Sequence, residues 1–367
     1  MKKIYLVFCA FSISVLFNAC SSGKAALKKG DYYDATMEAI QRLRENPNRK
    51  KAIEVLTQAY PLTVDYIDNT IQNGIKADDP KKWRTAVAGY QRINFLSDQI
   101  NTSPGALKVI PHPQTRYKEL ADAKTNAADE AYNEGINEMM KNTRNDYKQA
   151  YYDFKDANSF QQGYKESIEM QNQAEFKATL RVAFEEINNS RFNYGTFQPV
   201  INSLQRLFLS FKPVAQKDTV PPQQYLRIIF NGYQQNRPYI STRTETQTRQ
   251  VVVGQVKGSD GKMVDQLQSV SANITYFHKT ISGNSQANVT ISDPSNNPLQ
   301  NFSVNGAYSW VYDWATFSGD SRALSGNAAS WVQRREVFPN DQEIYNQTIR
   351  DLQNSLAYQL KSFYSQY

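Results

Sequence analysis

The stretch GDYYDA, residues 30–35, predicts the start of a helix that packs closely against a neighbouring helix. Its Gly-Asp pair favours a turn followed by a helix start. Tyr32 then faces inward, and the small side chain of Ala35 lets a second helix approach. The helix is expected to end at Asn46-Pro47, because proline lacks the amide hydrogen that a helix interior needs.

The same pattern returns twice further along the chain, as NDYKQA at residues 145–150 and, less clearly, as KWRTA at 82–86. These copies resemble tetratricopeptide repeats, although their spacing is irregular. The resemblance implies a helical-repeat domain over residues 20–178 whose concave surface binds peptides or partner loops. Trp83, Tyr147 and Tyr151 are candidate partner-binding residues, and the sequence leaves open whether they line such a surface or belong to the core.

The pattern changes near residue 179, where apolar and polar residues begin to alternate as in a strand. Leu180–Glu185 is predicted as a strand, Thr196–Phe208 as a helix and Tyr225–Phe230 as a buried strand. Ile240–Val256 and Val264–Ile281 flank a glycine-rich turn, so together they predict a long hairpin.

The rest of the chain predicts two more strands and a closing helix. Ala287–Ile291 and Phe302–Ala315 are the strands, and Asn340 caps a helix with one apolar face. Residues 179–367 are therefore expected to form an α+β domain with a mainly antiparallel sheet and a terminal helix. This order of elements resembles the α+β domain of the curli secretion lipoprotein and of the lipoproteins that activate penicillin-binding proteins.

Three aromatic residues in this domain, Trp310, Tyr312 and Trp314, alternate along a predicted strand and so share one sheet face. One interpretation is that this face packs under the terminal helix, because large aromatic side chains supply much of a core. The other is that it binds a protein partner or a glycan, since Trp and Tyr are common in interface hot spots.

The N-terminus has the pattern of an export signal. Lys2 and Lys3 precede an apolar stretch, Ile4–Phe17, that is too short to span a bilayer, and a small residue precedes Cys20. This resembles a bacterial lipoprotein signal over residues 1–19, which implies lipidation of Cys20. An ordinary signal peptide, with Cys20 as a free thiol, is the alternative.

Composition narrows the chemistry of the exported chain. Of its 367 residues, two are cysteines and two are histidines, and the net charge is +7. Few thiols and imidazoles remain for a nucleophile or a zinc site, so we expect no enzyme activity, no metal and no cofactor. No basic-aromatic motif calls for nucleic acid.

These observations together predict a lipid-anchored, non-enzymatic protein of a Gram-negative outer membrane, held there by its N-terminal lipid. Surface export of bacterial lipoproteins resembles a rule that requires acidic residues just after the lipidated cysteine. Ser21–Ala26 contains none, so the periplasmic face of the outer membrane is favoured. The expected role is that of an adaptor or assembly factor that binds envelope proteins in secretion, outer-membrane biogenesis or cell-wall synthesis. A surface-exposed protein that captures glycans or nutrients is the alternative.

Overall fold

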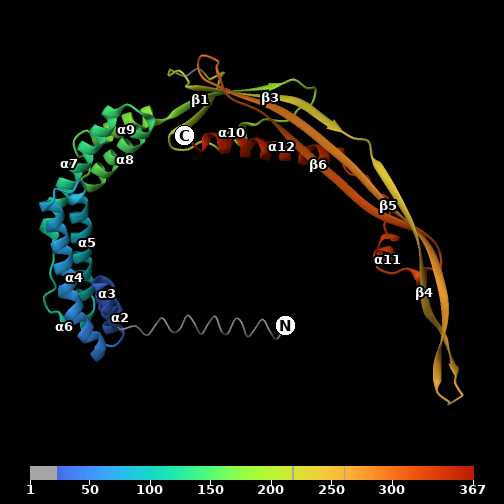
Figure 1. Cartoon of the computed structure of the whole chain (residues 1–367), viewed down its shortest axis with the longest axis horizontal. Helices are drawn as coiled ribbons and strands as arrows, with labels where there is room; N and C mark the ends of the chain where they lie inside the picture. Colours follow the sequence, from blue (N-terminus) through green and yellow to red (C-terminus); the bar gives the residue numbers. More distant parts are fainter. Residues whose placement is uncertain (1–22, 217–218, 260) are drawn as a thin grey trace. The chain divides into compact units, whose positions relative to one another are not determined.

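The computed structural model describes residues 23–216, 219–259 and 261–367; the predicted signal segment and Cys20 lie outside these ranges. The described residues form two compact units, one ending at Ala178 and the other beginning at Thr179. The first unit is helical, and the second contains the described strands together with a long terminal helix (Figure 1). This mixture of helix and sheet agrees with the predicted α+β class.

The helical unit is a succession of helices in which each long helix packs against the next long one along the chain. Its core is rich in alanine: Ala35, Ala86 and Ala150 have no exposed surface, as the sequence pattern predicts. The helix that contains Ala35 ends at Glu45, just before Asn46-Pro47. The helices are α2 (Lys24–Lys29), α3 (Tyr32–Glu45), α4 (Lys50–Lys76), α5 (Lys82–Asn101), α6 (Pro104–Val109), α7 (Tyr117–Lys141), α8 (Arg144–Phe160) and α9 (Ser167–Ala178).

Membrane-spanning helices were sought in the described part of the chain. None there combines the length and the apolar character that crossing a bilayer requires.

The second unit is built on one mixed sheet. β1 runs parallel to β2 and β3, and the other pairs are antiparallel. β5 lies at the centre, with β3 and then β4 along one edge and β6 along the other. The strands are β1 (Leu180–Asn188), β2 (Leu209–Pro213), β3 (Gln224–Gln235), β4 (Tyr239–Lys257), β5 (Met263–Ser292) and β6 (Pro298–Gly319).

The helix predicted at Thr196–Phe208 is wrong in its extent, because α10 covers only Gln198–Asn202. Beyond it the chain turns, and Phe208 adopts a left-handed backbone conformation with φ of 68°. The turn leads directly into β2, which the sequence analysis missed. β2 is only five residues long and ends in proline, so it gives little periodic signal.

The strand predicted at Ala287–Ile291 is likewise not separate; it is the end of β5, which continues without a break from Met263 to Ser292. Residues 282–286, which lie between the two predicted strands, are extended. A Cβ at Gly283 would lie 2.4 Å from Oγ1 of Thr348, so the glycine makes room for the terminal helix.

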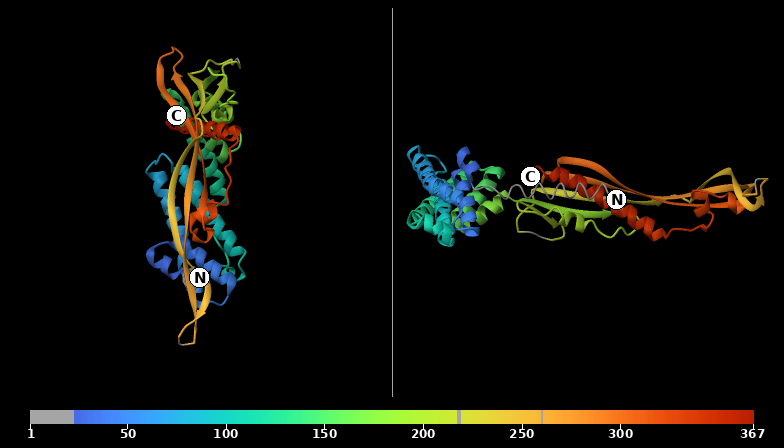
Figure 2. Two further views of the ribbon diagram at one scale, coloured as in Figure 1. Left: turned by 90° about the vertical axis from the view of Figure 1, so that its right-hand side faces the viewer. Right: turned by 90° about the horizontal axis from the view of Figure 1, so that it is seen from below.

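That helix, α12 (Asp341–Tyr364), is capped by Asn340, whose side chain accepts a hydrogen bond from the amide of Gln342, as predicted. It lies along one face of the sheet, under β5 and β6 (Figure 2). Its inward residues join those of β1, β3 and β5 in the main core of the unit.

The buried face of β5 changes along its length. Even-numbered residues are buried from Val270 to Tyr276, and odd-numbered residues are buried from Lys279 to Ile291. The first set is covered by two short helices, η2 (Ser321–Ala323) and α11 (Asn327–Trp331). The second set faces α12 and the segment that precedes it. The chain after β6 therefore covers both faces of the sheet in turn.

Candidate functional site

The three aromatic residues predicted to share a sheet face do so. Ring centroids of Trp310 and Tyr312 are 5.7 Å apart and those of Tyr312 and Trp314 are 6.1 Å apart, in both cases stacked. Trp314 also stacks on Phe277 of β5, at 4.9 Å with an interplanar angle of 5°. We call Trp310, Tyr312 and Trp314 the aromatic row.

Beside the aromatic row, on β5 and opposite Tyr312, lies Lys279, which has no exposed surface. Its ammonium forms an ion pair with Glu336 and lies 3.4 Å from the carbonyl oxygen of Val337. It also lies 3.5 Å from the ring centroid of Phe338 and 5.5 Å from that of Trp314, within the range of cation–π attraction.

The row is thus covered by the segment 335–338 rather than by α12, because the Tyr312 hydroxyl also donates to the carbonyl of Arg335. Trp314 is buried, whereas Trp310 and Tyr312 keep part of their surface exposed. The structure places the row at the junction between core and surface. Its main contacts hold the segment that leads into α12.

A more exposed apolar surface lies at the far end of the hairpin. β6 pairs with β5 only from Ala272 onward, so residues 249–257 and 263–270, which we call the arm, form a ribbon of two strands (Figure 1). The turn at its tip is closed by hydrogen bonds between Gly258 and Lys262 and between Gly261 and Gly258. Such a ribbon alone is marginally stable in water.

The arm carries large apolar side chains on both of its faces. Val252, Met263 and Leu267 occupy one face and are each more than half exposed; Val256 and Val264, at 50% and 53%, occupy the other. Isolated exposed apolar residues are ordinary, but a concentration on one projecting element is typical of a protein interface. Sequence reasoning predicted the hairpin but not that its end would stand apart, because that depends on where β6 stops.

The candidate residues of the helical unit lie on different helices and are partly buried. Trp83 on α5 packs against the helical core, and its amide donates to Glu130 on α7. On α8, the Tyr147 hydroxyl donates to Asn142, and Tyr151 packs beside the small core around Phe154. The structure therefore gives all three a packing role.

A charged cluster joins three of these helices near Trp83. Arg84 of α5 pairs with Glu134 of α7 at 2.8 Å and with Asp153 of α8 at 3.5 Å. Asp153 is 3% exposed, and burial raises the pKa of its carboxyl group. Burial also raises the pKa of Glu130. The cluster therefore links α5, α7 and α8, although Nε of Arg84 and Oε1 of Glu130 are buried without a hydrogen-bond partner among the described residues.

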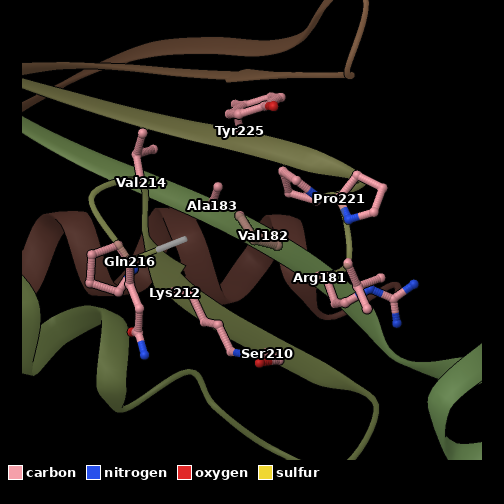
Figure 3. Close-up of a pocket in the computed structure, with 12 residues that line it drawn as sticks. Arg181, Val182, Ala183, Ser210, Lys212, Val214, Gln216, Pro221 and Tyr225 are labelled. Carbon is pink, nitrogen blue, oxygen red and sulfur yellow. The ribbon is translucent and has the colours of Figure 1, made fainter. Parts of the chain in front are cut away.

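A small hollow lies on the sheet face opposite α12, beside the loop after β2 (Figure 3). Arg181, Ser210 and Lys212 line it together with Tyr225 and the proline-containing loop. Its volume is about 170 Å³. Ligand pockets generally measure about 300–1,000 Å³, so this space suits water or a small ion better than an organic substrate.

A polar row across three strands has the residue types of a hydrolytic triad without its geometry. Nδ1 of His278 lies 2.7 Å from Oδ1 of Asp313, and Ser241 is opposite His278 on the next strand. Among the described hydrogen bonds, none joins Ser241 to His278, as a serine nucleophile would require. His278 is 51% exposed on an open sheet face.

The adjacent acids Glu185 and Glu186 point to opposite faces of β1. Glu185 pairs with Arg227, whereas Glu186 accepts hydrogen bonds from Tyr194, Thr196 and the amide of Phe197 ahead of α10. In the described ranges, no group of three or more His, Cys, Asp or Glu residues is arranged to hold a metal ion.

Comparison of the chain with known proteins adds no family. No protein-family model matches it, and no curated protein matches it.

Proposed function

We propose that this protein is a lipid-anchored adaptor or assembly factor of a Gram-negative outer membrane that acts by binding other envelope proteins. The observation that carries the proposal is the arm, a two-stranded ribbon with exposed apolar side chains on both faces. A partner that covers these residues would supply the burial that the isolated ribbon lacks.

The anchoring part of the proposal rests on the sequence at Cys20. The basic start, the short apolar stretch and the small residue before Cys20 are the pattern of a lipoprotein signal. Stable anchoring takes two or more acyl chains. We place the anchor at the periplasmic face, and protease treatment of intact cells tests this: protection of the protein agrees, and its digestion contradicts it.

We also infer that the helical unit consists of divergent tetratricopeptide-like pairs. The fully buried alanines Ala35, Ala86 and Ala150 support this, since small residues let paired helices approach. In the sheet unit, the order β1, α10, β2, β3, antiparallel strands and α12 supports a relationship to the envelope lipoprotein domains that it resembles.

The test is capture of envelope proteins by the full-length protein after crosslinking in cells. The double substitution Met263→Glu and Leu267→Glu places two charges on the apolar arm. It is expected to abolish the capture of a specific partner. The matched control, Asn301→Asp with Asn305→Asp, adds two charges at exposed positions of β6 and should leave capture unchanged. The proposal would be refuted if the unsubstituted protein captured no stable envelope partner.

The alternative function, capture of glycans, is favoured by the exposed parts of Trp310 and Tyr312 alone. Aromatic rings that bind sugars must be accessible, whereas Trp314 is 7% exposed and the row is tied to segment 335–338. Surface digestion by protease, together with loss of glycan binding in Trp310→Ala, would support this alternative.

A further inference from the structure

The outer edge of β4 is long, and among the described residues few of the usual devices protect it. β4 runs for 19 residues and pairs only with β5 among the described strands. At about 3.4 Å per residue, this leaves roughly 60 Å of backbone edge. Natural edge strands are kept short or are blunted by lysine, proline or a covering segment. β4 contains no proline, and its one lysine is the last residue, Lys257. A bulge is another such device, and the bulge of β4 lies at Val253, toward the end of the strand, which leaves Tyr239–Val252 regular.

The backbone of β6, the other long edge of the sheet, makes hydrogen bonds with the segments that follow it. On β6, the amide of Ala307 donates to Asp351 of α12, and the carbonyl of Asp313 accepts from Arg334. In the described hydrogen bonds, the backbone of β4 receives nothing comparable from outside its ladder with β5. The backbone edge that lacks such contacts is therefore β4. Its side chains do have partners within the copy: Gln247 accepts from Ser325, and Glu245 accepts from Tyr276 and pairs with Arg243 at 3.3 Å.

We propose that β4 pairs with β4 of a second copy of this chain, antiparallel, about a two-fold axis at Gln247. In this register Glu245 of each copy lies opposite Arg249 of the other, so the interface contains two pairs of opposite charge. Opposite charges across antiparallel strands are stabilising, and like charges are destabilising.

Neighbouring symmetric registers are worse by the same rule. An axis at Thr246 sets Arg243 opposite Arg249, and an axis at Glu245 or at Arg249 sets that residue opposite itself. An axis at Thr248 forms no pair of opposite charges.

An axis at Thr244 does pair Arg243 with Glu245 but overlaps only from Tyr239 to Arg249. That register leaves the exposed Val252 and Val253 outside the interface.

The Gln247 register also matches the exposed apolar residues at the two ends of β4. Tyr239 is 68% exposed and Ile240 41%, whereas Val252 and Val253 near the other end are 55% and 44% exposed. With Gln247 at the centre, Val252 of one copy comes opposite Thr242 and diagonal to Ile240 of the other, and Val253 follows at the bulge. Direct and diagonal neighbours across paired strands are within reach of such side chains.

The pairing uses Val252 of the arm but leaves the far edge of the arm, β5 from Met263 to Leu267, free for another protein. Dimerisation through β4 is thus separate from the proposed function, and either one can fail without the other.

The cysteine content of the chain makes a direct test practical. Its two cysteines are Cys9 and Cys20, so residues 21–367 contain none. In the full-length protein in its native membranes, Gln247→Cys would place the two new thiols opposite each other. Directly opposed residues lie about 4.5–5.5 Å apart between Cα atoms, which suits a disulfide.

Thr242→Cys is the matched control, because Thr242 is exposed on the same strand but lies opposite Val252 of the second copy. Its two thiols would be about 30 Å apart. Mild oxidation is expected to link Gln247→Cys into dimers on the order of tenfold more than Thr242→Cys. The unsubstituted chain, oxidised in the same way, shows how much dimer forms through Cys20.

The charge pairs are tested in the Gln247→Cys background. Arg249→Glu sets two carboxylates against each other and is expected to lower the crosslinked fraction roughly tenfold. The double substitution Glu245→Arg with Arg249→Glu exchanges the charges and should restore it. Three results would overturn the proposal: no dimer at position 247, equal dimer at 242 and 247, or crosslinking of position 247 to a different protein.

Discussion

Replacing Lys279 with methionine is expected to leave the sheet unit as stable as before or more stable, whereas replacing Glu336 with glutamine is expected to weaken it. Lys279 has no exposed surface, so its charge is fully removed from water. Apolar replacement of buried ionic groups is often neutral or stabilising by about 1–4 kcal/mol. Methionine keeps an unbranched stem under Trp314, and Glu336, which is 40% exposed, stays solvated.

Glu336→Gln has the opposite consequence, because the ammonium stays buried without its counter-ion. Breaking a fully buried pair costs about 3–5 kcal/mol. Because Glu336 is 40% exposed, solvent already screens part of the attraction, and we expect a loss of about 2 kcal/mol. For a unit of this size that corresponds to a fall in Tm of about 4–8 °C.

The distribution of tryptophan supplies the assay. The chain has four tryptophans, of which Trp83 alone belongs to the helical unit. In a Trp83→Phe background, fluorescence during urea unfolding reports on the sheet unit only. The double variant of Lys279 and Glu336 gives their coupling energy. Equal destabilisation by the two single substitutions would refute the view that the buried ammonium is a net cost offset by Glu336.

Three further outcomes are expected. Gly306→Ala should destabilise the sheet unit by about 1–3 kcal/mol in the same urea titration, because its Cβ would lie 2.3 Å from the carbonyl oxygen of Thr348; an unchanged midpoint would show that α12 moves freely. Leu352→Ala, at a position without exposed surface, should cost about 2–5 kcal/mol. Burial raises the pKa of Asp153 above its ordinary value of 3.8, so protonation of this carboxyl group stabilises the folded helical unit. That stability is fully present below the pKa of an aspartate in the unfolded chain and is lost as the pH rises through the folded pKa; Asp153→Asn should therefore flatten the pH dependence of Tm above about pH 4, followed by circular dichroism.

The elements that the sequence predicted well are those whose local pattern determines their packing. Small and aromatic residues at helical spacing identified the helical unit, and Asn340 identified the start of α12. The hairpin followed from alternation on both sides of a glycine-rich turn. In each case the residues that set the conformation lie within one or two turns of one another.

The errors arose where a distant segment decides the conformation. Gly283 resembles a turn residue until α12 is present to occupy the space above it. The aromatic row was predicted correctly as one face, but its cover is segment 335–338, whose contact with Lys279 no local periodicity encodes. Similarly, the arm is exposed because β6 stops at Gly319, which pairs with Ala272 of β5, so that no third strand covers the residues of β5 before Ala272.

β5 extends as a single strand from the tip of the arm to the region under α12, and this gives the sheet unit a mechanical axis. Tension applied to the arm along β5 would reach β3 and β6 lengthwise. Their hydrogen bonds to β5, each worth about 0.5–1.5 kcal/mol, would then resist sliding together instead of opening one after another. A partner that pulls on the arm would therefore load the unit along the direction in which it resists force best. Single-molecule stretching along β5 should require a higher force than stretching across the strands.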